Sequence, residues 1–70
     1  MRLVINGEQR EPLGATLNDI WEEEARELQT DSPSGFAIAL NGRVVPKTRW
    51  RDTPVSDGDQ ITISRAMAGG

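Results

Sequence analysis

Residues 36–46 read FAIALNGRVVP, an apolar run that meets an Asn-Gly pair and returns as a second, shorter run. The bulky residues of the first run alternate with alanines, which is typical of a strand with one bulky face and one nearly flat face. Asn41-Gly42 favours the positive φ angles of a tight two-residue turn, and Pro46 ends the returning strand. The stretch therefore predicts an antiparallel hairpin.

A second hairpin is predicted near the start of the chain. Leu3-Val4-Ile5 is a short apolar strand that leads directly into another Asn-Gly pair, Asn6-Gly7. The chain that follows, near residues 9–13, is polar and short. We therefore expect it to form an edge strand that ends at Gly14.

The segment between the two hairpins carries the signals of one helix. Thr16 is predicted as the N-cap, and Asp19 can reach back to the first free amides in a shortened capping box. Apolar residues at helical spacing should share one face that packs on a sheet: Leu17, Ile20, Trp21, Ala25 and Leu28. The opposite face should be solvated, with Glu22 paired to Arg26; its other glutamates are Glu23, Glu24 and Glu27. A polar loop should replace the helix by about Thr30.

The last predicted strand follows a turn at Asp57-Gly58-Asp59. Residues 60–64 alternate, with their two isoleucines expected to point inward. Two strands, a helix, two strands, a loop and a final strand form the order of an α+β fold, the β-grasp, in which a mixed sheet of four to five strands wraps around one helix. The first and last strands should lie side by side and parallel. We expect residues 1–66 to form this domain and residues 67–70 to form a flexible C-terminal tail.

Composition excludes several classes of function. The chain has 70 residues, enough for one small domain, and a net charge of -3 that opposes non-specific binding to nucleic acid. It has no cysteine and no histidine, so disulfides, thiolate metal sites and the commonest general base are missing. Asp57 and Asp59 resemble the start of a calcium loop, but no later ligands follow, so we predict a turn and no metal site. The apolar run at residues 3–5 is too short for a signal peptide or a membrane span, so a cytoplasmic protein without membrane or nucleic-acid partners is expected.

A basic segment surrounds Trp50 and has three interpretations. Arg43, Lys47, Arg49 and Arg51 could contact nucleic acid, with Trp50 as a stacking ring, but the acidic net charge argues against this. They could also form a solvated loop, or dock electrostatically onto an acidic partner. The Trp50 side chain is expected to cover the open end of the small core.

The two glycines Gly69-Gly70 are the strongest functional signal in the sequence. They follow the last predicted strand closely, so residues 67–70 would project as a slim arm of about 13 Å that can enter the active site of another protein. Glycine has no Cβ, which lets it thread a narrow channel and leaves the terminal carbonyl open to attack. The α-carboxylate is ionised at neutral pH and is a poor acyl donor, so it must first be activated.

The chain carries in order the motifs Phe36-Ala37-Ile38-Ala39-Leu40-Asn41, Val44-Val45-Pro46, Trp50, Asp57-Gly58-Asp59-Gln60-Ile61 and Ala68-Gly69-Gly70. In their order and spacing these motifs resemble the ThiS family, the ubiquitin-like sulfur carriers of thiamine biosynthesis. The resemblance covers nearly the whole chain. The related small subunits of molybdopterin synthase usually carry prolines just before the tail, where this chain has Arg65-Ala66-Met67, which favours the thiamine branch.

The resemblance implies a chemistry for the tail. An E1-like adenylyltransferase of the ThiF type would use ATP to convert the Gly70 carboxylate into an acyl-adenylate. Sulfur from a donor such as a cysteine desulfurase would then displace AMP and leave a terminal thiocarboxylate. A thiazole synthase of the ThiG type would receive this sulfur. The chain is then a protein co-substrate with no bound cofactor, and not an enzyme.

Recognition by the activating enzyme should extend beyond the last residues. Arg65, Ala66 and Met67 precede the reactive end and are expected to dock on that enzyme, while Ala68 and Gly69 complete the tail. Three alternatives stay open. The chain could be a ubiquitin-like protein modifier, a molybdopterin-type sulfur carrier, or a plain β-grasp interaction module whose Gly-Gly ending is incidental.

Overall fold

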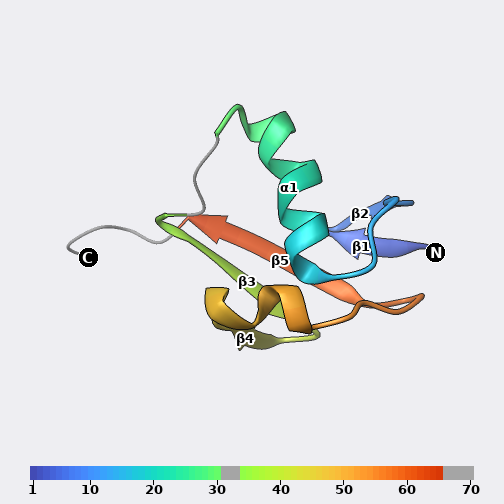
Figure 1. Ribbon diagram of the computed structural model, residues 1–70. Coiled ribbons are helices and arrows are strands. Elements are labelled where there is room, and N and C mark those ends of the chain that lie inside the picture. Colours follow the sequence, from blue (N-terminus) through green and yellow to red (C-terminus); the bar gives the residue numbers. More distant parts are fainter. Residues whose placement is uncertain (31–33, 66–70) are drawn as a thin grey trace.

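A mixed sheet of five strands forms the body of the molecule, and an α-helix crosses one of its faces (Figure 1). The computed structural model describes residues 1–30 and 34–65. The elements follow in the order β1 (Leu3–Ile5), β2 (Glu8–Arg10), α1 (Leu17–Leu28), β3 (Phe36–Leu40), β4 (Arg43–Val45), the 3-10 helix η1 (Lys47–Asp52) and β5 (Gln60–Arg65). This architecture confirms the predicted β-grasp fold. No helix in the two described ranges is long and apolar enough to cross a membrane.

The two Asn-Gly turns set the register of both hairpins. Asn6, Gly7, Asn41 and Gly42 adopt φ angles of 50°, 82°, 52° and 85°, as a two-residue hairpin turn requires. The turns join β1 to β2 and β3 to β4, so that β2 and β4 become the edges of a sheet ordered β2-β1-β5-β3-β4. At its centre, β5 pairs parallel with β1 and antiparallel with β3. The predicted pairing of the first and last strands is confirmed.

The core lies between α1 and the covered face of the sheet. Four of the five residues predicted for the buried face of α1 belong to it, but half of the Leu28 surface is exposed. Leu28 is the last helical residue and lies almost one turn beyond Ala25, where the buried stripe ends. Helical spacing identifies a face of the helix but does not show how far the sheet extends beneath it. The buried core residues are Leu3, Ile5, Leu17, Ile20, Trp21, Ala25, Ile38, Trp50, Val55, Ile61 and Ile63.

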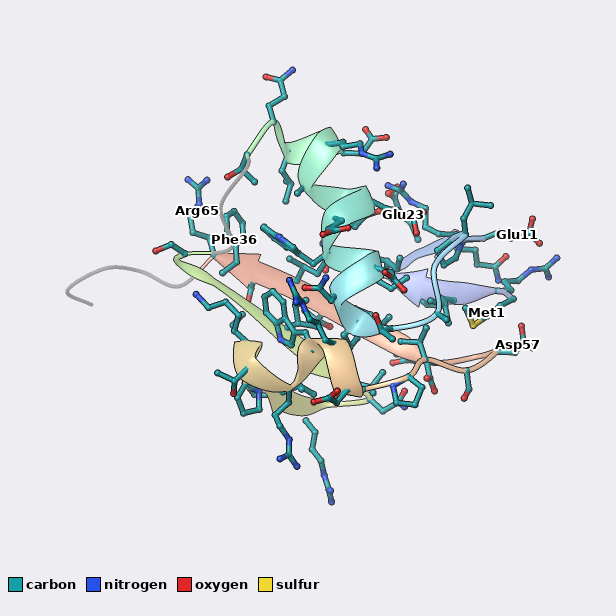
Figure 2. The ribbon with its side chains drawn as sticks, viewed as in Figure 1. Met1, Glu11, Glu23, Phe36, Asp57 and Arg65 are labelled. Atoms are coloured by element: carbon teal, nitrogen blue, oxygen red, sulfur yellow. The ribbon has the colours of Figure 1, made fainter. Side chains whose placement is uncertain are left out.

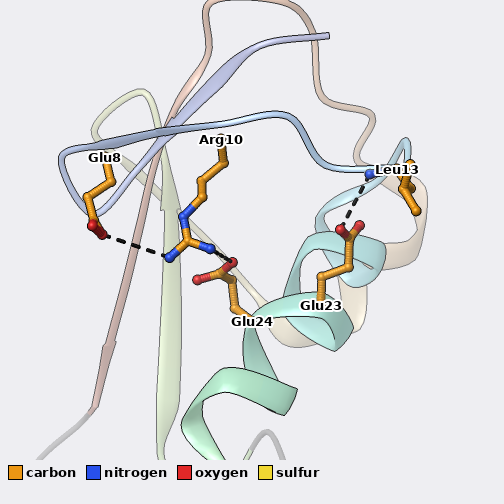
Figure 3. Close-up of polar contacts among 5 residues, drawn as sticks. All are labelled: Glu8, Arg10, Leu13, Glu23 and Glu24. Carbon is orange, nitrogen blue, oxygen red and sulfur yellow. Dashed lines mark hydrogen bonds and ion pairs between the residues drawn. The ribbon is translucent and has the colours of Figure 1, made fainter.

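Strand β2 ends at Arg10, earlier than predicted. Pro12 has no amide hydrogen with which to continue a ladder, and the backbone beyond it binds to the helix instead. The Leu13 amide donates to the Glu23 carboxylate at 3.3 Å (Figure 3). The Gly14 amide donates to the same carboxylate at 3.1 Å. Gly14 lies so close to α1 that a Cβ there would collide with a side chain of the first helical turn. The segment after β2 is therefore a loop fixed to the helix.

The acidic face of α1 is only partly solvated, contrary to the prediction. Glu24 forms an ion pair of 3.5 Å with Arg10, and the Glu24 side chain is only 14% exposed (Figure 3). Together with Glu23, it connects the helix to β2 and to the loop that follows. The predicted pair between Glu22 and Arg26 is not among the ion pairs of the described residues.

The N-terminus of α1 has the predicted capping box. The Asp19 amide donates to the Thr16 hydroxyl at 3.2 Å, and the amides of Ala15 and Thr16 donate to the Asp19 carboxylate at 3.0 and 3.1 Å. The bond from Ala15, followed by those from Thr16, stabilises the ionised carboxylate and lowers the pKa of Asp19 below its ordinary value.

We expect Asp19→Ala to destabilise the domain at neutral pH and to matter less in acid. Because the folded-state pKa of Asp19 is lowered, its contribution is fully present above the unfolded-state pKa of about 3.9 and is lost as the pH falls through the folded value. Thermal unfolding of both proteins from neutral pH down to about pH 2 measures the difference. Thr16→Ala should lower the free energy of unfolding by about 1 kcal/mol at neutral pH. A difference in thermal stability between wild type and Asp19→Ala that stays constant over the whole pH range would contradict this role of Asp19.

The predicted loop around Trp50 is instead the 3-10 helix η1. The Trp50 side chain is 1% exposed, its Nε1 donates to the Val45 carbonyl at 2.9 Å, and its ring lies 5.8 Å from that of Trp21. The Arg49 amide donates to the Pro46 carbonyl at 2.8 Å, which closes a turn of the i to i+3 type. The prediction that Trp50 covers the core is confirmed.

Candidate functional site

The predicted reactive residues lie at the C-terminal end of the chain. Outside the described residues are Ala66, Met67, Ala68, Gly69 and Gly70, so their predicted roles and the predicted flexible tail stay predictions. The remaining predicted docking residue, Arg65, is the last residue of β5. The part of the site that the structure describes is therefore the end of β5, from which the chain continues toward Gly70.

At its C-terminal end, β5 is paired with a strand on one side only, which is β3. β1 pairs only with the beginning of β5, whereas β3 follows β5 to its end and places Phe36 opposite Arg65. The Asn6 side chain occupies the position beyond β1, where its Oδ1 accepts a bond from the Ile63 amide at 2.8 Å. The backbone of β5 is thus held on both sides as far as Ile63 and by β3 alone after it.

A column of aromatic rings supports Arg65. The guanidinium carbon of Arg65 lies 5.1 Å from the centre of the Phe36 ring, and Figure 2 shows the two side chains together at the end of β5. The Phe36 ring is 4.9 Å from the Trp21 ring, which in turn contacts Trp50. A cation–π contact at an exposed site contributes about 0.5–1 kcal/mol. The column links the base of the tail to the centre of the core.

The Arg65 guanidinium is a positive charge held at the end of β5 by its contact with Phe36. It is exposed, and its planar group can bind a carboxylate or phosphate of a partner through two parallel hydrogen bonds. The sequence identified Arg65 only by its nearness to the end of the chain, and its contact with Phe36 was missed. The alternation of β3 does indicate which face of the strand Phe36 lies on. It does not show that Phe36 lies opposite Arg65, because the register between β3 and β5 depends on contacts distant in sequence.

The opposite end of the molecule is a hydrogen-bonded turn. The carboxylate of Asp59 accepts bonds from the Ser56 amide at 2.7 Å and from the Asn41 side-chain amide at 3.0 Å. Asp57 accepts a bond from the Arg2 amide at 2.7 Å, which confirms the interpretation of this segment as a turn. Within residues 1–30 and 34–65, no group of three or more acidic, histidine or cysteine side chains could hold a metal ion.

Comparison with known proteins places this fold in a family. The sequence profile of the ThiS family matches residues 3–70, which is nearly the whole chain. This chain belongs to the ThiS family. The match confirms the resemblance seen in the sequence, and it includes the ThiS-type ending Gly69-Gly70.

Two ThiS proteins and one solved ThiS structure are similar to this chain. Sulfur carrier protein ThiS of Thermus thermophilus is 35% identical over 66 residues, covering 94% of this chain and 95% of that protein. Sulfur carrier protein ThiS of Escherichia coli is 43% identical over 37 residues, and the match spans 53% of this chain and 56% of that protein. The crystal structure of a thiamine biosynthesis protein (ThiS) from Geobacter metallireducens matches with a TM-score of 0.73 at 27% identity and covers 100% of both chains.

Proposed function

We propose that this chain is a sulfur carrier whose Gly70 carboxylate becomes a thiocarboxylate that supplies the sulfur of the thiamine thiazole. The observation that carries the proposal is the ThiS-family match, which reaches the Gly69-Gly70 ending. The E. coli and T. thermophilus relatives are both named sulfur carrier proteins, which supports a sulfur-carrier role for this chain.

The proposed chemistry takes place on partner enzymes. In an E1-like adenylyltransferase of the ThiF type, a carboxylate oxygen of Gly70 attacks the α-phosphorus of ATP and pyrophosphate leaves. The terminal sulfur of a persulfide formed by a cysteine desulfurase then attacks the acyl carbon and AMP leaves. A thiol reduces the resulting acyl disulfide, which releases the thiocarboxylate and leaves the two thiol sulfurs joined as a disulfide. The thiocarboxylate sulfur is passed to a thiazole synthase of the ThiG type. The chain acts as a co-substrate and holds no cofactor in this scheme.

The end of β5 is suited to present such a tail. Pairing with β3 and the contact between Arg65 and Phe36 fix the direction in which β5 ends. The core that supports this contact includes Trp21, which packs directly on Phe36. A partner that grips the tail therefore meets a rigid base, so less conformational entropy is lost on docking.

Mass spectrometry of the intact chain tests the proposal. After incubation with the activating enzyme, ATP and a sulfur source, the mass should rise by the difference between one sulfur and one oxygen atom. Lys47→Arg is the control, because Lys47 is the chain's one lysine and arginine keeps its charge. Sulfur loading should be the same in wild type and in Lys47→Arg.

A protein modifier would give a different result. It would form amide-linked conjugates that persist under reducing conditions, and self-conjugates would use Lys47 or the Met1 amine as acceptor. Conjugates of this kind without any thiocarboxylate species would overturn the sulfur-carrier proposal.

A further inference from the structure

Positive charge is concentrated in one short part of the fold. Residues 43–51, which span β4 and most of η1, hold four basic side chains and no acidic one, while the rest of the chain holds four basic and eleven acidic side chains. The four form what we call the β4–η1 patch: Arg43, Lys47, Arg49 and Arg51. All four are exposed, and none of them takes part in the ion pairs of the described residues, which use Arg2 and Arg10.

The start of η1, which carries Lys47, lies on the side of the molecule that holds Arg65, whereas Arg43 is opposite Leu40 near the other end of the sheet. β4 runs antiparallel to β3, so it leads from Arg43 toward the end of β3 that holds Phe36. Val45 is opposite Ile38 and Arg65 is opposite Phe36, which places Val45 two strands and two residue steps from Arg65, or about 12 Å. The first turn of η1 follows immediately and lies on the same side as the C-terminal end of β5 (Figure 1).

The acidic side chains all lie outside the patch. Five of the eleven are on α1, and Figure 2 shows Glu11 and Asp57 at the end of the molecule opposite to Arg65 and Phe36. The chain therefore has a negative net charge overall, but the start of η1, on the side of the molecule that holds Arg65, is positive. Such an asymmetry orients a protein in the field of a charged partner before contact is made.

We propose that the β4–η1 patch docks on an acidic surface of the enzyme that activates Gly70 and steers the tail end of the carrier toward it. This inference rests on the proposed function. A partner that holds the tail beside Arg65 and covers a typical footprint of about 800 Å² also reaches the start of η1. The patch then supplies recognition that the four-residue tail is too short to provide.

A protein surface fits the patch better than a nucleic acid does. Single-stranded nucleic acid is held by exposed rings on which bases stack, but Trp50 and Trp21 are 1% and 5% exposed and the Phe36 face is occupied by Arg65. The excess of acidic side chains outside the patch repels any polyanion that extends past it. An acidic surface confined to one side of a folded partner avoids that repulsion.

Steady-state kinetics of ATP–pyrophosphate exchange test the patch. The purified activating enzyme is titrated with the carrier at low salt and at physiological salt. Lys47→Gln with Arg49→Gln should raise the KM for the carrier about tenfold at low salt and leave kcat unchanged. The matched control is Arg2→Gln with Arg10→Gln, which removes the same charge outside the patch and should change KM by less than about twofold. The difference in KM between the patch variant and wild type should become smaller as the salt concentration rises.

The outcomes separate this inference from the proposed function. If wild type supports exchange and the two double variants have the same KM, the docking role of the patch is refuted and the proposed carrier function is not. Absence of exchange with wild type would overturn both. A labelled oligonucleotide that binds wild type but not the patch variant, with KM unchanged, would assign the patch to nucleic acid and refute the inference. Thermal unfolding of each variant shows that the fold is retained.

Discussion

Deletion of Gly70 is expected to abolish ATP-dependent adenylation and to leave thermal unfolding unchanged. The shortened chain still ends in glycine, but its carboxylate falls about 3.5 Å short of the reacting position in the activating enzyme. Every core residue among those described lies at or before Ile63, so the deletion removes no core contact found in that part of the chain. Pyrophosphate exchange should drop to the level measured without carrier.

Affinity tags provide the matched control for the deletion. A tag added after Gly70 turns the carboxylate into an amide and should be as inactivating as the deletion. The same tag before Met1, at the other end of the molecule from Arg65 (Figure 2), should leave adenylation intact. Adenylation of the Gly70-deleted chain at the wild-type rate would refute the proposed tail chemistry.

Replacement of Trp50 by alanine is expected to unfold much of the protein at 25 °C. Trp50 is the largest of the fully buried side chains, and such a truncation costs about 3–5 kcal/mol. A single core in a domain of this size rarely supplies more than about 3–5 kcal/mol of stability. Urea titration followed by far-UV circular dichroism measures the loss without relying on the tryptophan signal.

Two further variants serve as controls for the loss of stability in Trp50→Ala. Trp50→Phe keeps an aromatic ring but removes the Nε1 donor to the Val45 carbonyl, so it should cost less than Trp50→Ala. Val44→Ala changes a residue that is 71% exposed and should shift the free energy of unfolding by no more than about 0.5 kcal/mol. Equal stability of Trp50→Ala and Val44→Ala would contradict the role of Trp50 in the core.

The strands and their order could be predicted because local signals and global fold agree. The Asn-Gly pairs accept the φ angles of a two-residue turn, and such a turn fixes the register of its own hairpin. The inward positions of β5 follow from its alternation with period two. The capping box of Thr16 and Asp19 likewise depends on residues three positions apart, so the start of α1 was predictable.

The errors arise where contacts between distant segments decide the outcome. β2 stops at Arg10 because Glu23, on the helix, binds the amides beyond Pro12. The segment around Trp50 forms η1, and Val55 is buried after it, although no periodic pattern marks either. Sequence spacing reports local geometry and carries little information about such packing.

For the candidate site, the sequence indicated the reactive end but not its support. Arg65 could be named because it precedes the tail, whereas its contact with Phe36 requires the register of β3 on β5. The role of the Asn6 side chain was also missed. Asn6 was recognised as a turn residue, but its side-chain oxygen also accepts a bond from the Ile63 amide and so joins the two ends of the sequence. Both contacts follow only from the assembled sheet.

The parallel pairing of β1 with β5 also determines how the domain carries a mechanical load. Met1 and Arg65 lie at opposite ends of the molecule (Figure 2), so a pull between them acts along both central strands. Bonds between parallel strands loaded in this direction are sheared together and do not open one after another. Tension that a partner applies to the tail is therefore shared at the centre of the sheet by the bonds from Val4 to Asp59, from Asn6 to Ile61 and from Ile63 to the Asn6 side chain.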